Sequence, residues 1–483
     1  MKTPYPSYKP SGVPWLGDVP EHWDVLPNRA LFAEVKERDH PDEPMLSVTI
    51  TRGVIRQQAL LADSSKKDGS NLDKSAYKLV RPGDIAYNKM RAWQGAVGVS
   101  DLRGIVSPAY VVQRPREGSS PRYFHYLMRT PVFAKEAERW SYGITSDMWS
   151  LRPEHFRMIV SCKPPLAEQS AIVRYLDHVD RRIRKYIRAK QRLIARLNEQ
   201  KQAIIHQAVT GQIDVRTGKP YPKYKPSGVA WLGGIPEHWR IARLKDAATV
   251  QTGLTLGKRY EGVTIESRPY LRVANVQAGR LDLGHIKHIS VPVKEASGAT
   301  LRAGDVLMTE GGDIDELGRG CVWHDEIPNC LHQNHIFAVR CRQDIMIPEF
   351  LEGLMVSMHG RAYFQLTAKQ TTNLASTNST TLRAFPILLP GIAEQKSLLE
   401  HIAAQTAALD AAIARVEAEV LLLREYRTRL VADVVTGKLD VREAATNLPD
   451  ETEEVEEPEA EAPEELEEAN EEALASHDAE GEE

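Results

Sequence analysis

Apolar residues recur at alternating three- and four-residue spacings along two segments of the chain. In the first segment, this stripe consists of Ile172, Leu176, Val179, Ile183, Tyr186, Leu193, Leu197 and Ile204, with Lys190 and Gln200 interrupting it. In the second, it consists of Ile402, Leu409, Ile413, Val416, Val420, Leu423, Leu430 and Val434. This spacing is typical of a helix that packs against another helix in a coiled coil. We predict two helices of about 40 residues, each roughly 60 Å long at 1.5 Å per residue.

Prolines and glycines mark where each helix starts and stops. Pro164-Pro165 precedes the first helix, and Pro390 precedes the second. No Gly or Pro interrupts either predicted helix before Gly211 or Gly437, and we expect these glycines to cap the C-terminal ends.

The chain contains one unit written twice. Residues 5–23 (YPSYKPSGVPWLGDVPEHW) and 221–239 (YPKYKPSGVAWLGGIPEHW), which we call the two linking repeats, agree at 15 of 19 positions. Three further pairs recur in the same order, namely 167–169 with 393–395, 209–215 with 435–441, and, more weakly, 81–84 with 302–305. We therefore expect two equivalent units about a pseudo-twofold axis. The linking repeats are predicted to be structural, with Trp15, Trp23, Trp231 and Trp239 as anchors, and the N-terminus should lie beside the end of the second helix near Val441.

The fold class that follows is α/β, in the sense of mixed α+β. Short apolar runs at 104–112 and 335–339 indicate strands, and 123–129 and 350–358 indicate short helices. The two long helices are predicted to pair in antiparallel fashion, although each could instead pack on its own domain. The predicted division is a first globular domain at 1–163, a helix at 164–215, a second domain at 216–389, a helix at 390–442 and an acidic segment at 443–483.

Charge separates the acidic segment from the rest of the chain. Residues 443–483 contain 19 acidic residues and no Lys or Arg, so 1–442 carry 62 basic against 47 acidic residues, a net charge of +15. A basic body suggests a polyanionic partner, nucleic acid first, although a solvated basic surface would look the same. The Glu-, Ala- and Pro-rich composition beyond about 447 predicts disorder. This segment either keeps the protein in solution or competes with DNA for the basic surface.

With these repeats, the chain resembles the DNA-specificity subunit of type I restriction-modification systems. The matching features are the doubled YKPSGV-x-WLG-x-x-PEHW, the two Ala-Glu-Gln helix starts and the two VTG-x-[IL]-DV helix ends. The stretches 89–95 (KMRAWQG) and 106–110 (VSPAY) are also similar to the family. The resemblance covers residues 1 to about 442 and leaves the acidic segment outside.

The resemblance implies a recognition subunit that performs no chemistry itself. Each globular domain would be a target recognition domain for one half of a split double-stranded DNA sequence. The paired helices would set the distance between the halves and bind two methyltransferase subunits, after which restriction (motor-nuclease) subunits join. S-adenosylmethionine, ATP and Mg²⁺ would be held by these partners, and this chain would bind no cofactor and no metal.

Loops with base-reading side chains are the candidate DNA contacts, because Lys and Arg suit phosphate or guanine, Gln and Asn suit adenine, and Trp can stack. In the first domain these residues are Asn88, Lys89, Arg91, Trp93, Gln94, Tyr142, Thr145 and Ser146. In the second domain they are Gln333, Asn334, Lys369, Gln370, Thr371, Thr372 and Asn373. Each loop could equally be a polar surface turn held by its own side chains, and Trp93 could belong to the core.

Two other functions are weighed against this interpretation. A stand-alone adenine methyltransferase is disfavoured because Ser107-Pro-Ala-Tyr110 lacks the second proline of the amino-methyltransferase motif, and no Gly-rich cofactor loop or P-loop is present. A scaffold that binds only proteins remains possible. The cluster Cys321, His324, Cys330, His332, His335 and Cys341 does not have the spacing of a zinc site. No signal peptide, membrane-length apolar run or CxxC pair is found, so a cytoplasmic protein with free thiols is expected.

Overall fold

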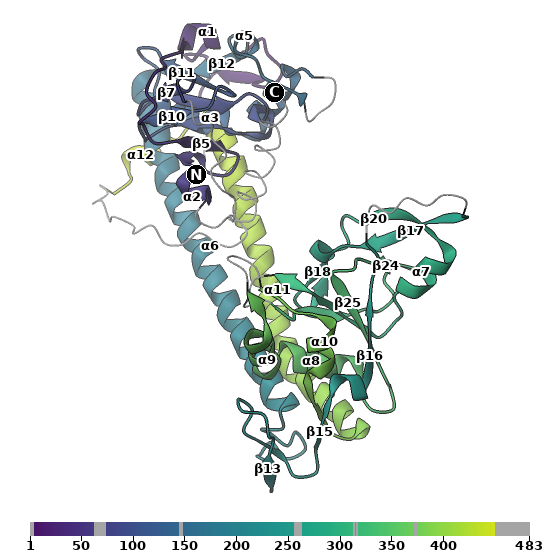
Figure 1. Cartoon of the computed structure of the whole chain (residues 1–483). Coiled ribbons are helices and arrows are strands. Elements are labelled where there is room, and N and C mark those ends of the chain that lie inside the picture. Colours follow the sequence, from purple (N-terminus) through teal and green to yellow (C-terminus); the bar gives the residue numbers. More distant parts are fainter. Residues whose placement is uncertain are drawn as a thin grey trace. The chain divides into compact units, whose positions relative to one another are not determined.

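The structure, a computed structural model, describes residues 4–61, 74–143, 148–255, 263–312, 314, 317–370 and 375–449. The chain divides into two compact units (Figure 1). Unit 1 comprises Met1–Gln191 and Glu417–Glu483, and unit 2 comprises Arg192–Val416. Each unit contains one β-rich domain and about half of each long helix, so the helices are shared between the units rather than separate from them.

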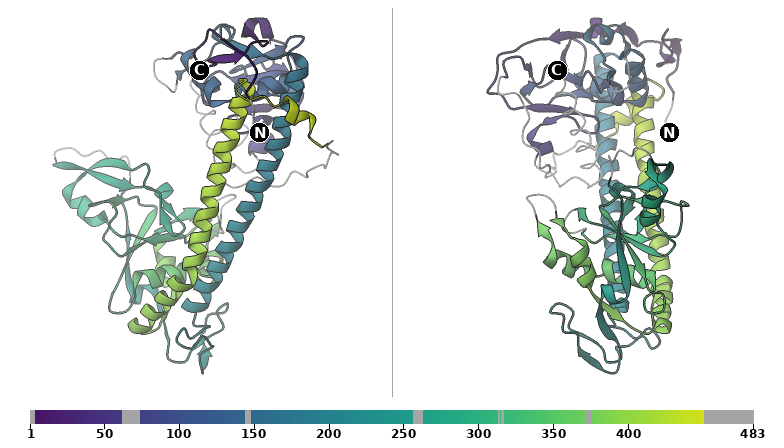
Figure 2. Two further views of the ribbon diagram at one scale, coloured as in Figure 1. Left: turned by 180° about the vertical axis from the view of Figure 1, so that it is seen from behind. Right: turned by 45° about the vertical axis from the view of Figure 1, so that its right-hand side comes forward.

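The two long helices are α6 (Leu166–Val209) and α11 (Ile392–Val435), each of 44 residues. They lie side by side and run in opposite directions (Figures 1 and 2). Within unit 1, Asp180 pairs with Arg427 and Lys190 with Glu419. Within unit 2, the Nζ of Lys201 lies 2.6 Å from Oδ1 of Asp410. Residue numbers thus rise on one helix as they fall on the other, which confirms the predicted antiparallel pairing.

Most of the predicted stripe is covered, but two of its members are not. Ile172, Leu176 and Ile183 are buried in unit 1. In contrast, Tyr186 is 54% exposed and Leu193 is 42% exposed, so their assignment to the contact between the helices was wrong. A straight helix has 3.6 residues per turn, and a strict 3.5-residue repeat therefore drifts around its surface. The neighbouring Ile187 and Ile194, both half-buried, take the covered positions.

Both helices end as predicted from their glycines. Gly211 and Gly437 adopt positive φ angles of 71° and 79°. Behind Gly211, the N–H of Gln212 donates to the carbonyl of Gln207. Behind Gly437, the N–H of Lys438 donates to the carbonyl of Asp433. These bonds satisfy carbonyls that a helix end leaves unpaired.

The domain of unit 1 is built from short strands and helices. Its strands are β1 (Tyr8–Pro10), β2 (Asp18–Pro20), β3 (Asp24–Pro27), β4 (Phe32–Val35), β5 (Leu46–Thr49), β6 (Gly53–Arg56), β7 (Lys78–Val80), β8 (Ile85–Asn88), β9 (Val97–Val99), β10 (Gly104–Val106), β11 (Tyr110–Pro115) and β12 (Val160–Lys163). Its helices are α1 (Asn28–Leu31), α2 (Gln58–Leu61), η1 (Ala92–Gln94), α3 (Pro121–Met128), α4 (Pro131–Arg139) and α5 (Pro153–Phe156).

Among the described residues, the domain of unit 2 has more strands than that of unit 1. They are β13 (Tyr224–Pro226), β14 (Gly234–Pro236), β15 (Arg240–Arg243), β16 (Ala248–Thr252), β17 (Ile265–Leu271), β18 (Val276–Gln277), β19 (Arg280–Leu281), β20 (Lys287–Pro292), β21 (Asp305–Thr309), β22 (Gly311–Gly312), β23 (Gly320–Val322), β24 (Leu331–His332), β25 (Ile336–Cys341), β26 (Lys369–Gln370), β27 (Ala375–Ser376) and β28 (Pro386–Leu389). Its helices are η3 (Leu244–Asp246), η4 (Val273–Asn275), α7 (Val293–Ala299), α8 (Pro348–Val356), α9 (Met358–Thr367) and α10 (Ser379–Ala384).

Each domain contains the same four-stranded antiparallel sheet. The strand order is β4-β11-β8-β9 in unit 1 and β16-β25-β21-β23 in unit 2. An ion pair recurs across both sheets. The guanidinium group of Arg114 donates to both carboxylate oxygens of the buried Asp84, with N···O distances of 2.8 and 2.9 Å. Arg340 donates in the same way to Asp305, at 2.8 and 2.6 Å. The weak sequence repeat at 81–84 and 302–305 therefore marks equivalent turns.

The linking repeats have the structural role that the sequence predicts. Trp23 and Trp239 are fully buried, and Trp15 packs against the core of unit 1. The hydroxyl of Tyr8 donates to the carbonyl of Gly437 at 3.2 Å, so the N-terminal segment lies beside the end of the second helix, as expected. Trp231 is 38% exposed but is also anchored, because its ring stacks on His359, lies against Tyr363, and donates through Nε1 to Nδ1 of His359 at 3.2 Å.

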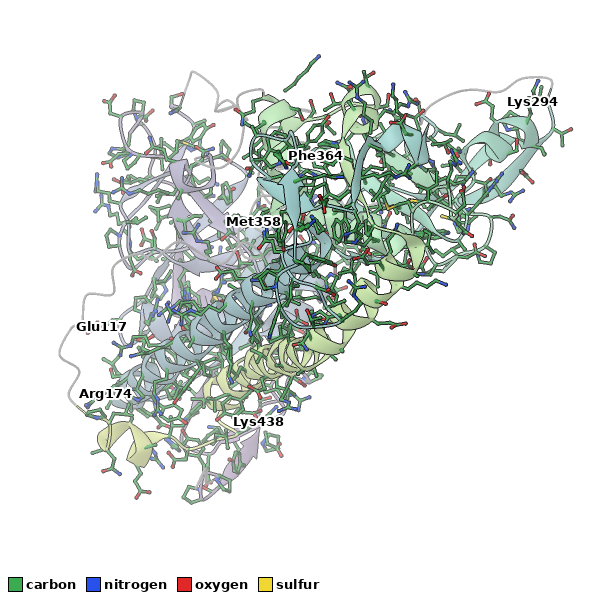
Figure 3. All side chains as sticks on the ribbon, turned by 90° about the horizontal axis from the view of Figure 1, so that it is seen from below. Glu117, Arg174, Lys294, Met358, Phe364 and Lys438 are labelled. Atoms are coloured by element: carbon green, nitrogen blue, oxygen red, sulfur yellow. The ribbon has the colours of Figure 1, made fainter. Side chains whose placement is uncertain are left out.

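The described chain continues past the predicted start of the acidic segment. A short helix, α12 (Arg442–Thr446), begins just before Glu443, and its Ala445 is buried. Arg174 lies on α6 (Figure 3). One of its guanidinium nitrogens donates to the carbonyl of Leu448 at 3.1 Å. The boundary at 443 was therefore too early, since packing of α12 outweighs its polar composition. Residues 450–483, for which disorder was predicted, lie outside the described residues. Among the described helices, none is long and apolar enough to cross a membrane.

Candidate nucleic-acid interface

In unit 1, two of the predicted loops meet at one end of the four-stranded sheet. The first follows β8 and begins at Lys89, whose N–H donates to the carbonyl of Ala109. The second is the hairpin in which Tyr142 pairs with Ser150. The N–H of Leu151 donates to the carbonyl of Lys89 at 2.8 Å and ties the two loops together. Because Lys89 is bonded to Ala109, the turn 107–109 lies at the same edge as a third segment.

The predicted loops of unit 2 meet in the same way. The N–H of Glu310, directly after β21, donates to the carbonyl of His335 at 2.9 Å. The carbonyl of Glu310 accepts from Thr377, next to the β26–β27 hairpin, also at 2.9 Å. In that hairpin Lys369 pairs with Ser376. The bonds match those of unit 1 one for one, so Glu310 is equivalent to Lys89 and the turn 333–335 to the turn 107–109.

Basic side chains surround the edge in unit 1. Lys78 is buried, and its ammonium group donates to the carbonyls of Tyr110 at 2.6 Å and Pro108 at 3.3 Å. Burial lowers the pKa of Lys78 to about 8, and the positive charge of Lys89 contributes next; Glu34 opposes the shift, and Arg38 and Lys36 add smaller effects in the same direction as Lys89. This concentration of positive charge next to the loops suits a phosphate backbone.

In unit 2 a different side chain supports the equivalent turn. The Nδ1 of His332 bonds the carbonyl of Ile336 at 2.9 Å, at the position that Tyr110 occupies in unit 1. His332 is fully buried, and burial lowers its pKa to about 4, so it is neutral at physiological pH and donates through Nδ1. A neutral imidazole thus replaces the Lys78 ammonium, and the two edges differ in charge while sharing one backbone.

Some predicted residues of unit 1 shape the loop instead of facing solvent. Asn88 is 6% exposed, and its Oδ1 accepts from the N–H of Met90 at 2.9 Å. Trp93 donates through Nε1 to the carbonyl of Met90 at 2.8 Å and packs edge-on against Trp149. Sequence reasoning could not separate these supporting residues from exposed ones, because both kinds occur in one polar stretch.

Other predicted residues are accessible. Gln94 is exposed, 59% of Tyr142 is exposed, and Lys89 and Arg91 are half-exposed. In unit 2, Lys369 and Gln370 are exposed and Asn334 is half-exposed, whereas Gln333 uses its Oε1 to accept from Val273 at 3.2 Å. The remaining predicted residues, Thr145, Ser146, Thr371, Thr372 and Asn373, lie outside the described residues.

Sequence reasoning missed two polar residues at the unit 2 edge. Glu310 was not considered, and His335 was considered only as a zinc ligand. Nδ1 of His335 lies 2.6 Å from Oε2 of Glu310, and both side chains are accessible. The signal was available, since Lys89 follows Asp84 by five residues and Glu310 follows Asp305 by the same number. Among the described residues, no group of three or more His, Cys, Asp or Glu side chains could hold a metal ion.

Comparison with known proteins gives consistent relatives. No family model matches the chain. It is 22% identical over 448 residues to the EcoKI specificity subunit of Escherichia coli K12, covering 89% of this chain and 92% of that protein. It is 21% identical to the StySPI specificity subunit of Salmonella potsdam, covering 69% of each. A chain from a solved type I restriction-modification complex matches in fold, with a TM-score of 0.55 and 16% identity over 87% of this chain and 99% of that one.

The doubled β-rich domain, the paired helices and this sequence similarity over most of the chain define a recognition protein built on the type I specificity fold. The chain is a specificity subunit of a type I restriction-modification system. Specificity subunits are the non-catalytic components of such systems.

Proposed function

We propose that this subunit recognises a bipartite double-stranded DNA sequence, one half with the loop edge of each domain, and directs partner subunits to it. The observation that carries this proposal is the repetition of one loop-bearing sheet edge with different side chains. An identical backbone frame with Lys89 in one copy and Glu310 in the other suits two different half-sites.

The proposed DNA contacts are the accessible residues of these edges. In unit 1 they are Lys89, Arg91, Gln94 and Tyr142, and in unit 2 they are Asn334, Lys369 and Gln370, together with the predicted residues outside the described ones. Asn88 and Trp93 would act by holding the loop in shape.

The partners follow from the proposed role. Two N6-adenine methyltransferase subunits and motor-nuclease subunits would bind this chain and supply S-adenosylmethionine, ATP and Mg²⁺. Unit 1 supports protein docking, because its helices carry the exposed apolar side chains Tyr186, Leu421, Leu422 and Tyr426 (54%, 67%, 62% and 45% exposed). Exposed apolar side chains of this size, one on α6 and three on α11, are typical of protein interfaces.

The test is to co-express the chain with a type I methyltransferase subunit and to map methylated adenines across a genome. We expect a split motif with one methylated adenine in each half. Methyl transfer from labelled S-adenosylmethionine by the purified chain alone would show a stand-alone enzyme instead. Absence of sequence-selective DNA binding even with the methyltransferase present would show a scaffold that binds only proteins.

A further inference from the structure

One short hydrogen-bonded chain at the unit 2 edge has no counterpart in unit 1. The carboxylate of Glu310 lies 2.6 Å from Nδ1 of His335, and Nε2 of His335 lies 3.2 Å from Nδ2 of Asn334. The positions equivalent to Asn334 and His335 in unit 1 are Pro108 and Ala109, which cannot form such a chain.

With a neutral imidazole, these three hydrogen-bonded side chains have one consistent arrangement of protons. A carboxylate only accepts, so Nδ1 of His335 carries the proton and donates to Glu310. In the neutral imidazole, Nε2 then accepts, and the amide of Asn334 must turn its NH₂ group toward it. Glu310 therefore fixes the tautomer of His335, and His335 fixes the orientation of the Asn334 carboxamide.

The backbone beneath Asn334 is also held. Its N–H donates to the carbonyl of Leu254 at 3.0 Å, and the flanking carbonyl of His335 accepts from Glu310. Gly253 allows this close approach, since a Cβ there would lie 2.0 Å from the carbonyl oxygen of His332. No described residue bonds the Oδ1 of Asn334, and the second N–H of its amide is likewise left for a ligand.

We infer that Asn334 recognises the major-groove edge of an adenine in the half-site of the second domain, with Glu310 and His335 as its positioning residues. Oδ1 accepts from the adenine N6 amino group while the second N–H donates to N7, the bidentate pairing that Asn makes with adenine. Glu310, at the position of Lys89, is repelled by phosphate, and its bond to His335 gives its carboxylate this supporting role.

The inference rests on the proposed function and is tested in the same co-expression assay. Four variants are compared, namely Asn334→Ala, Glu310→Ala, Glu310→Gln and His335→Leu. We expect Asn334→Ala, Glu310→Ala and His335→Leu to lose discrimination at the same adenine–thymine pair, with selectivity there falling roughly 10- to 100-fold. Glu310→Gln keeps selectivity near that of the wild type, because the Gln Oε1 still accepts from Nδ1. Lys89→Ala is the matched control and affects only the first half-site.

Failure of the positioning role and failure of the proposed function give different results. If wild-type chain and methyltransferase give no split motif, the proposed function fails. If the split motif is present but Glu310→Ala and Asn334→Ala relax different base pairs, or Glu310→Gln behaves like Glu310→Ala, the positioning role is wrong. Because Glu310 and His335 are 31% and 54% exposed, these variants should fold, and their unfolding in urea checks this directly.

Discussion

Glu168 and Glu394 are equivalent residues at the starts of the two long helices, yet they hold different numbers of buried donors. Oε1 of Glu168 accepts from the Tyr5 hydroxyl at 2.6 Å and from Nε1 of Trp23 at 2.9 Å, and His22 lies near Oε2. Glu394 bonds the hydroxyl of Tyr221 and Nε2 of His238. The Nε1 of Trp239 has no partner among the described residues.

This difference predicts unequal stability effects. Glu168→Ala leaves two buried donors without an acceptor, and we expect a loss of about 2–5 kcal/mol in the free energy of unfolding of unit 1. Glu394→Ala, the matched control, leaves one such donor and should lower the stability of unit 2 by about 1–2 kcal/mol. Urea denaturation of the full chain measures both. Equal shifts in the two variants would contradict the count of buried donors.

A second residue-scale prediction concerns pH. Burial raises the pKa of Glu352 on α8 to about 7, and the nearby carboxylate of Glu349 adds to the shift. Between its usual range near 4.5 and about 7, the folded chain holds a proton that the unfolded chain has lost, so stability falls as pH rises through this window. At pH 8 we expect Glu352→Gln to be more stable than wild type by about 1–3 kcal/mol.

The check is thermal or urea unfolding at pH 8 and at pH 4.5. The advantage of Glu352→Gln should shrink at the lower pH, where the wild-type carboxyl is protonated in the folded state. The exposed Glu400→Gln serves as the matched control. A constant advantage at both pH values would mean that the ionisation of Glu352 is not the cause.

At the scale of elements, the long helices were predictable and the sheets were not. Forty-residue apolar periodicity with glycine ends leaves few alternatives, and only local positions such as Tyr186 and Leu193 were wrong. The strands are two to seven residues long and differ in sequence between domains, so their equivalence becomes visible only through backbone bonds such as those of Lys89 and Glu310. The candidate loops were found by their polar side chains, but which side chains turn inward depends on turn geometry that composition does not encode.

The helices also carry an element-scale prediction, which rests on the proposed function. Insertion of seven residues into each helix at matched points, after Lys190 in α6 and before Glu419 in α11, keeps the apolar register. Each insert adds about 10 Å of helix, equal to roughly three base pairs. We expect methylome mapping to show a spacer about three base pairs longer with both half-sites unchanged. A changed half-site would mean that the helices do more than set distance.

At the scale of the whole molecule, charge is divided between a basic body and the acidic segment 450–483, which contains 18 acidic residues and no Lys or Arg. Without that segment the chain has 62 basic and 48 acidic residues, a net charge of +14 in place of −4. The composition predicted this division of charge, whereas the structure shows where the chain can be truncated. A truncation at 447 would remove Leu448, whose carbonyl accepts from Arg174.

Truncation after Pro449 therefore tests whether the acidic segment competes with DNA while leaving α12 in place. If the segment occupies the basic surface, its removal should raise DNA affinity roughly tenfold at 50 mM salt, and the gain should fade toward 300 mM because both interactions are screened. A full-length chain with the segment's Asp and Glu changed to Asn and Gln should match the truncated one, since charge and not length is responsible. Fluorescence anisotropy with a labelled duplex measures all three proteins. Unchanged affinity at low salt would rule out competition and leave the segment the simpler role of keeping a basic protein in solution.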